Sequence, residues 1–215
     1  MTPGPFSLSE EIATTPMPRI SRTEFSALPL RVNTLLADVP LHDVWAVSLP
    51  RLREGVTLDA FLRGARKNAS GVAEAKTPRL PWPGRALVGL RLLLGRIFQL
   101  DAEPKDANSA WFANRLTPED RTRSSIAPGA ADGHFRVVYR FANEQLVELH
   151  NRTVHAAALT ALVEAADGYR YYFAVYVASV GWITPLYMAL IDPFRRWIIY
   201  PAMLENVRAK WVRTI

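Results

Sequence analysis

The fold of this chain is decided by one stretch, residues 134–180, which reads HFRVVYRFANEQLVELHNRTVHAAALTALVEAADGYRYYFAVYVASV. Apolar and polar residues alternate with a period of two at its start, as they do in a half-buried strand. Three further runs, residues 145–150, 154–164 and 169–180, follow after short turns. Because short connections join antiparallel neighbours, the stretch predicts a four-stranded antiparallel meander.

A long helix is expected after the meander, from about Thr184 to Trp211. Its apolar residues recur at helical spacing, at Leu186, Leu190, Phe194, Trp197, Pro201 and Leu204. Pro193 and Pro201 each remove a backbone hydrogen bond, so a kink is expected. Three charged residues near the middle argue against a membrane span. The sequence therefore predicts an α+β domain whose sheet is covered by this helix.

The chain before the meander is organised less regularly. Residues 1–32 are rich in proline and predict a flexible arm, whereas residues 33–215 form a single domain in this interpretation. A short strand is expected at Asp43–Leu49, and helices at Thr57–Lys67, at Arg85–Phe98 and from Thr117 onward. The second of these helices is apolar over most of its girth and too short to cross a bilayer, which favours burial over an interfacial position.

The composition excludes several classes of site. The chain of 215 residues has no cysteine, so disulfides, thiolate metal sites and cysteine nucleophiles are excluded. Its net charge of +6 comes from scattered basic pairs without a nucleic-acid-binding motif, and we expect no nucleic-acid partner. Weak contact with an anionic membrane surface is more plausible, because arginines flank apolar helical segments. We expect no metal and no cofactor, and a cytoplasmic location because no secretory signal pattern is present.

Five stretches occur along the chain in a characteristic order: NTLLAD at 33–38, LTPEDR at 116–121, FRVVYRF at 135–141, ELHNRTVH at 148–155 and LYMALIDPFRR at 186–196. In this order they resemble the family called domain of unknown function 2867, DUF2867, over roughly Asn33 to Trp211. The resemblance implies a START-like (SRPBCC) helix-grip fold, in which a curved antiparallel sheet wraps around a long C-terminal helix. It implies a cavity between them for an apolar small molecule, and no established catalysis. Many relatives have a histidine where this chain has Arg195, so a role of that histidine cannot be transferred.

The densest polar cluster of the sequence is Glu148, His150 and His155 around a predicted hairpin. Glu148 and His150 share one face of a strand, and His155 returns on the neighbouring strand. A carboxylate beside two imidazoles could act as a general base, but a third metal ligand at suitable spacing is missing. We favour the interpretation that these three residues are ordinary polar residues of a hairpin, with their hydrogen bonds satisfied.

A second group of residues is expected to bind a ligand. Alternating aromatic and small residues on the last strand suit either a ligand wall or tight packing of a helix, and both interpretations stay open. Asp192 and Arg195 are one helical turn apart and are expected to pair, more as a surface salt bridge than as a buried anchor. The predicted ligand-binding residues are Tyr139, His155, Tyr172, Tyr176, Tyr187, Asp192, Arg195 and Trp197.

Three hypotheses of function follow. The first is a binding domain for a hydrophobic small molecule between sheet and C-terminal helix. The second is a protein that binds a membrane surface or a protein partner through apolar, arginine-flanked helices. The third, less favoured, is an enzyme that uses Glu148, His150 or His155 on a cyclic substrate.

Overall fold

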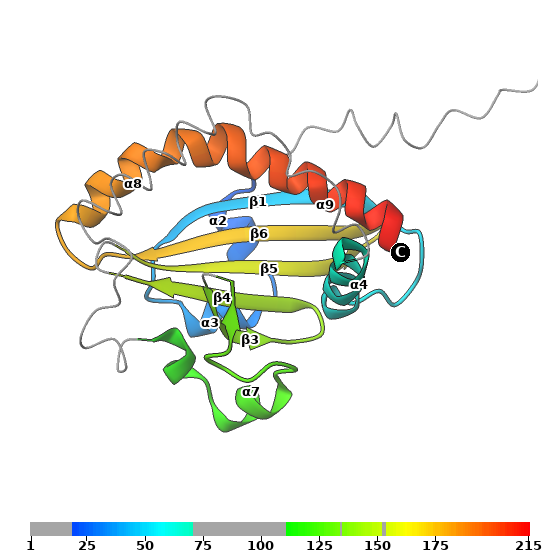
Figure 1. The fold of residues 1–215 in the computed structure, drawn as a ribbon, viewed down its shortest axis with the longest axis horizontal. Helices are drawn as coiled ribbons and strands as arrows, with labels where there is room; N and C mark the ends of the chain where they lie inside the picture. Colours follow the sequence, from blue (N-terminus) through cyan, green and yellow to red (C-terminus); the bar gives the residue numbers. More distant parts are fainter. Residues whose placement is uncertain (1–18, 71–110, 134, 152–153) are drawn as a thin grey trace, which may run out of the picture.

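The computed structural model describes residues 19–70, 111–133, 135–151 and 154–215, and its centre is one antiparallel sheet of six strands (Figure 1). Across the sheet the strands follow the order β1-β6-β5-β4-β3-β2. Their bounds are β1 (Leu41–Pro50), β2 (Ala131–Asp132), β3 (Phe135–Arg140), β4 (Glu144–His150), β5 (His155–Ala165) and β6 (Gly168–Ala178). Strands β3 to β6 are the predicted meander, and with helices on both faces the chain is an α+β protein, as predicted.

The first and last strands of the chain lie side by side, with Leu49 of β1 opposite Tyr169 of β6. The turn that brings β6 back from β5 contains Gly168, whose φ is 154°. A Cβ atom at this position would overlap the carbonyl oxygen of Leu49. The close approach of β1 to this turn therefore requires glycine.

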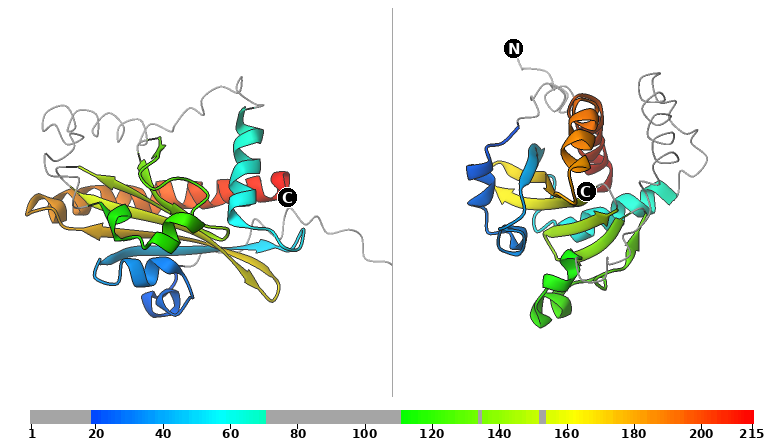
Figure 2. Two further views of the ribbon diagram at one scale, coloured as in Figure 1. Left: turned by 90° about the horizontal axis from the view of Figure 1, so that it is seen from below. Right: turned by 90° about the vertical axis from the view of Figure 1, so that its left-hand side faces the viewer.

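The two faces of the sheet are covered by different helices, which Figure 2 shows on opposite sides of β1 and β6. One face, here called the short-helix face, carries Tyr172 and Tyr176 of β6 under α2 (Arg22–Ser26), α3 (Arg31–Leu35) and η1 (Phe112–Arg115). The other, the long-helix face, carries Tyr171 and Phe173 under α4 (Leu58–Ser70) and the C-terminal helix. Both faces are apolar, so β6 is buried along nearly its whole length.

The C-terminal helix runs as three consecutive segments: α8 (Ile183–Phe194), the π-helical η2 (Arg195–Ile199) and α9 (Tyr200–Thr214). The prolines at 193 and 201 flank the π-helical turn, as expected where prolines remove hydrogen bonds of the i to i−4 ladder. The far end of this helix is anchored by Trp211, which is fully buried and donates from Nε1 to the carbonyl oxygen of Pro50 at 2.9 Å.

Residues 19–32, which we assigned to the flexible arm, pack onto the body of the protein. The side chains of Phe25 and Val32 are fully buried in the core of the short-helix face. The Ser21 hydroxyl accepts a hydrogen bond from the backbone of Glu24 and caps α2. The folded part of the chain thus begins before residue 33.

Several local predictions are confirmed. The Thr57 hydroxyl accepts from the backbone of Ala60 at the start of α4, and Thr117 forms a capping box at the start of α7 (Pro118–Arg123). We expected buried and exposed residues to alternate strictly along β3, and this prediction is wrong. The register of β3 against β4 shifts between Val137 and Tyr139, and Val137, Val138 and Tyr139 are all buried. The predicted helix at residues 85–98 lies outside the described residues.

Candidate functional site

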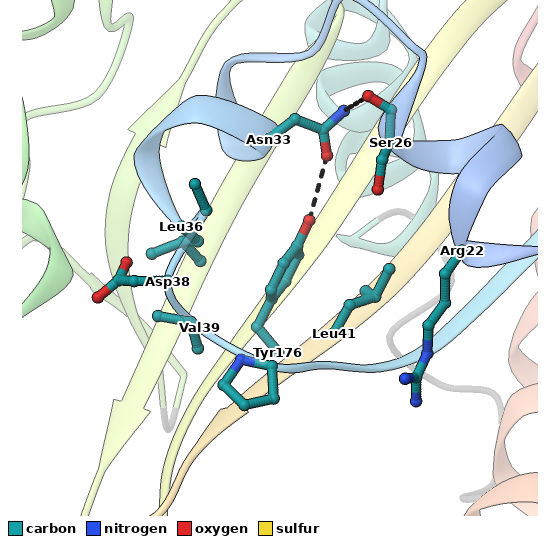
Figure 3. A pocket seen from close by; sticks show the side chains of 10 residues that line it. Arg22, Ser26, Asn33, Leu36, Asp38, Val39, Leu41 and Tyr176 are labelled. Atoms are coloured by element: carbon teal, nitrogen blue, oxygen red, sulfur yellow. Dashed lines mark hydrogen bonds between the residues drawn. The ribbon is translucent and has the colours of Figure 1, made fainter.

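A pocket of about 430 Å³ opens on the short-helix face, at the end of the sheet where β1 begins (Figure 3). Its wall combines α2, α3, the connection from α3 to β1, and one side chain of β6. Its lining residues are Arg22, Ser26, Asn33, Leu36, Ala37, Asp38, Val39, Pro40, Leu41 and Tyr176. Half of these residues are apolar, and the others offer hydroxyl, amide and charged groups.

The orientation of Asn33 in this pocket is set by the helices around it. Its Nδ2 donates to the carbonyl oxygens of Leu28 at 2.9 Å and Phe25 at 3.2 Å, which ties α2 to α3. Its Oδ1 is therefore left for the hydroxyl of Tyr176, at a long 3.4 Å. Burial raises the pKa of Tyr176, and the nearby carboxylate of Glu144 raises it further. The hydroxyl is therefore protonated at physiological pH, and its single hydrogen can go to a bound molecule in place of the long bond to Asn33.

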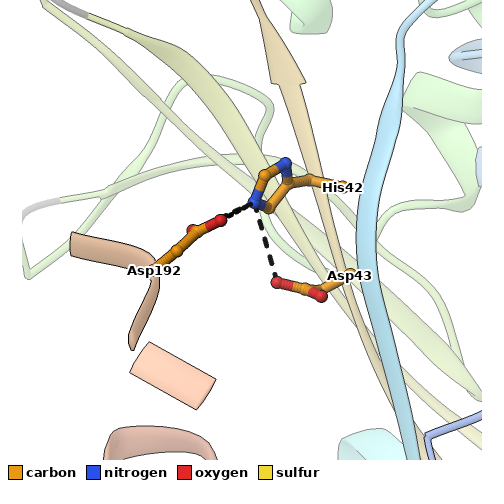
Figure 4. A group of neighbouring side chains, drawn as sticks. All are labelled: His42, Asp43 and Asp192. Atoms are coloured by element: carbon orange, nitrogen blue, oxygen red, sulfur yellow. Dashed lines mark hydrogen bonds and ion pairs between the residues drawn. The ribbon is translucent and has the colours of Figure 1, made fainter. Parts of the chain in front are cut away.

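A charged cluster lies on the opposite face, where the start of β1 meets the C-terminal helix (Figure 4). The register of β1 against β6 shifts between Leu41 and Asp43, which leaves His42 as the extra residue of a β-bulge. Nε2 of His42 lies 2.8 Å from Oδ2 of Asp192 and 3.8 Å from Oδ2 of Asp43. Two irregular segments, a bulge and the π-helical turn, thus meet at this cluster.

Three arginines surround the two carboxylates of this cluster. The fully buried Asp43 pairs with Arg19 at 2.6 Å and with Arg196 at 3.3 Å. Arg195 pairs with Asp192 at 3.3 Å and donates from Nε to the hydroxyl of Tyr200 at 2.5 Å. The predicted pair of Asp192 and Arg195 is confirmed. It is largely buried, with side chains 17% and 13% exposed, so the surface position that we favoured is wrong.

Among the residues that the structure describes, this cluster also contains a group that resembles a metal-binding site. His42, Asp43 and Asp192 each offer one ligand atom, and these atoms lie within 4.8 Å of one another. The carboxylate oxygens are, however, already bound by guanidinium groups. With three arginines against two carboxylates, the cluster has an excess of positive charge. This charge opposes the binding of a cation and favours an ion-pair network.

The predicted catalytic candidates gather on the short-helix face, where Glu148 accepts three hydrogen bonds. The donors are the backbone N–H groups of Phe112 at 2.8 Å and Ala113 at 3.1 Å, and Nε2 of His155 at 3.0 Å. The ring of His155 stacks between Phe112, at a centroid distance of 3.8 Å, and His150, at 4.3 Å. The structure therefore brings the three predicted residues together.

The burial of this group points to a structural role. Glu148 is 1% exposed and His155 is 5% exposed. The ring of Trp111 lies edge-on against both histidine rings, at 5.5 and 6.2 Å. A substrate could reach the carboxylate only if η1 left the sheet. The hydrogen bonds instead fasten η1 to β4, which explains why a charged side chain points into the core.

A second buried glutamate, which the sequence analysis missed, repeats this arrangement. Glu144 accepts from the backbone N–H of Arg31 at 2.9 Å and from the hydroxyl of Tyr139 at 3.1 Å. Desolvation by burial raises the pKa of Glu144. The spacing of the two glutamates could have predicted this second site. Glu144 and Glu148 are four residues apart on one strand, so both side chains point to the same face.

The predicted ligand-binding residues do not converge on one cavity. On the short-helix face, Tyr176 lines the pocket, Tyr172 packs against Phe25 in the core, and Tyr139 is bonded to Glu144. His155 lies on this face within its ring stack. On the other face, Asp192 and Arg195 belong to the charged cluster, Trp197 is 80% exposed, and Tyr187 lies in α8 with a side chain outside the described part. The sheet separates the two groups.

The fold and its sites define an α+β domain with an antiparallel sheet covered on both faces, an open pocket on one face and an ion-pair network on the other. A family model described as "Protein of unknown function (DUF2867)" matches residues 35–202, and the chain belongs to this family. No curated protein and no solved structure matches the chain.

Proposed function

We propose that this protein binds a small hydrophobic molecule carrying a polar group, in the pocket between α2, α3 and the start of β1. The pocket itself carries the proposal: its volume of about 430 Å³ lies within the range of roughly 300–1,000 Å³ that is typical of small-molecule sites. We thus place the ligand on the short-helix face. The space under the C-terminal helix, where the ligand was expected, is filled by Phe173, Tyr200 and Leu204, which are buried together.

The chemistry of the lining supports a ligand of mixed polarity. Ala37, Pro40 and Leu41 offer apolar surface, while the Tyr176 hydroxyl and the Arg22 guanidinium offer donors. An apolar ring or chain would bury its surface against the first group, and a carbonyl or carboxylate oxygen could accept from the second.

Binding without reaction is the better-supported form of this proposal. The raised pKa of Tyr176 makes its hydroxyl a poor general base at neutral pH. The polar candidates for catalysis, Glu148 and His155, are enclosed by Trp111 and Phe112 in a separate part of the same face.

The helix-grip fold forms part of the proposal. Its support is the element order, in which the first and last strands pair and a long helix follows the last strand. The described pocket nevertheless lies outside the space between that helix and the sheet.

The test is native mass spectrometry of the full chain purified from its own host, followed by solvent extraction of any retained small molecule. Ser26→Trp places a large ring at the rim of the pocket, and we expect it to remove the retained mass. Thr23→Trp is the matched control, because Thr23 is an exposed position of the same helix and does not line the pocket. Equal retention by both variants would contradict the proposed site.

A further inference from the structure

At the positions whose side chains the structure describes, the outward side of the C-terminal helix is apolar from residue 181 to residue 202. We call this surface the outer ridge. The described exposed positions of this range are Gly181, Trp182, Pro185, Ala189, Pro193, Trp197, Ile199 and Ala202. Its two tryptophans are 84% and 80% exposed, and Ile199 is 44% exposed. Figure 1 shows α8 at the periphery of the molecule, beyond the sheet.

The charged residues of this part of the helix point the other way. Between residues 182 and 204 the sequence has only three charged residues, Asp192, Arg195 and Arg196. Asp192 contacts Nε2 of His42 at 2.8 Å, and Arg195 and Arg196 pair with Asp43 of β1, on the side of the helix that faces the sheet. A surface helix of a globular protein usually turns charged residues toward water. This helix buries Met188, Tyr200 and Leu204 against the sheet and also leaves an apolar side toward the solvent, which indicates that the outer ridge is covered by an apolar medium in use.

The side chains of the ridge suit the boundary of a lipid bilayer. Tryptophan prefers the interface between headgroups and acyl chains, because its ring is apolar and its N–H can still reach water. Trp182 and Trp197 are 15 residues apart, which corresponds to about 22 Å along a helix at ~1.5 Å per residue. Among the described helices, none is long and apolar enough to cross a membrane. The ridge would thus lie along the bilayer surface.

The charge of the same region complements an anionic surface. Of the five basic residues at 179–215, Arg195 and Arg208 are largely buried, whereas Lys210 and Arg213 reach the solvent beyond the ridge, in a chain of net charge +6. Beside the ridge, the side chain of Arg19 is 52% exposed and that of Arg196 is 32% exposed. Basic residues next to an apolar helix face are attracted to anionic headgroups over a distance of about one Debye length, ~8 Å at physiological salt.

We propose that the outer ridge docks on an anionic lipid bilayer, with the helix parallel to the surface and with Trp182 and Trp197 inserted at the interface. The pocket lies on the far face of the sheet, so docking leaves it open to the solvent. The two functions are therefore separable by mutation.

The experiment is co-sedimentation of the full chain with sucrose-loaded vesicles of phosphatidylcholine alone and of phosphatidylcholine with 30% phosphatidylglycerol. We expect binding to the anionic vesicles, with a shift of tryptophan emission to shorter wavelength, and at least about tenfold weaker binding to the neutral ones. Trp197→Glu should weaken binding to the anionic vesicles by about tenfold or more, because it removes a large aromatic anchor and adds a repelled charge.

Phe135→Glu is the control, since Phe135 is an exposed aromatic residue (39%) on β3, away from the C-terminal helix. It should bind like the wild type, and thermal melts of both variants should match the wild type. The proposal is overturned if the wild type fails to sediment with anionic vesicles at low salt, or if both variants lose binding equally. A dimer in light scattering that Trp197→Glu dissociates would also overturn it, because the ridge would then be an interface between two copies of the chain.

Discussion

The carboxylate of Glu148 accepts the backbone N–H of Phe112 at 2.8 Å, although the two residues lie on segments that are 36 positions apart in the sequence. Replacement of Glu148 by glutamine puts an NH₂ group where one carboxylate oxygen accepted a donor. We expect a loss of about 2 kcal/mol in the free energy of unfolding, measured by urea denaturation. Glu164→Gln is the control: Glu164 forms an exposed pair with Arg51, and its replacement should cost less than about 0.5 kcal/mol.

His155→Gln separates a structural from a catalytic role of the same group. If His155 only packs between Phe112 and His150, the variant loses stability while the small molecule that survives purification stays bound in the folded fraction. The measurements are a thermal melt and native mass spectrometry at a temperature well below its midpoint. An unchanged melt together with a changed bound mass would show that the histidine acts on the ligand.

Asp43 provides the charge that holds three arginines at the start of β1. The variant Asp43→Asn leaves the guanidinium groups of Arg19, Arg195 and Arg196 without a buried counter-charge. We expect about 3 kcal/mol of destabilisation, the usual size when one partner of a buried ion pair is removed. Asp38→Asn, which affects an exposed pair with Arg115, should change the urea midpoint little.

Because Glu144 is buried, we expect the free energy of unfolding to depend on pH in a specific way. Its pKa in the folded state is raised above the ordinary 4.5 by burial, so the folded protein favours the protonated form more than the unfolded chain does. The stabilisation is full below pH 4.5 and is lost as the pH rises through the raised folded pKa. Relative to Glu144→Gln, the wild type should thus lose stability across this window, as urea titrations at several pH values would show. A parallel pH profile of the two proteins would contradict the assignment.

Tyr176→Phe tests the polar contact of the proposed ligand. The variant keeps the ring that lines the pocket and removes the hydroxyl, so we expect about fivefold to tenfold weaker binding, or roughly 1 kcal/mol. Stability should change little, because the bond to Asn33 is long. Tyr172→Phe is the matched control on the same strand and the same face, outside the pocket lining. Isothermal titration with the extracted ligand measures both.

The strands and their turns could be predicted because each is specified by local sequence. Short turn sequences separate apolar runs within residues 135–180, and the turn at Gly168 uses a residue that the close approach of β1 demands. The choice of face could not be predicted. Both faces of β6 are apolar, so the sequence gives no sign that Tyr172 and Tyr176 lie on the side away from the C-terminal helix.

The position of Trp197 was missed for a different reason. A regular α-helical period places Trp197 on the stripe of Phe194 and Pro201. The π-helical turn at Arg195–Ile199 has more residues per turn, so it changes which residues face the sheet. Tyr200 is buried beyond this turn, and Trp197 is exposed. The contact of His42 with Asp192 likewise depends on a β-bulge, and no pattern of residues in the sequence predicts this bulge.

The pairing of β1 with β6 has a consequence for how the protein is made. During synthesis β1 leaves the ribosome well before β6, the neighbour with which it forms its ladder. Two of the sheet's hairpins, β4–β5 and β5–β6, bring strands together across short turns. In contrast, β1 can pair with β6 only after almost the whole chain has been synthesised. Such long-range pairing slows folding and leaves an unpaired strand open to aggregation in the meantime. The nascent chain is therefore expected to depend on chaperones until β6 and the helix behind it have emerged.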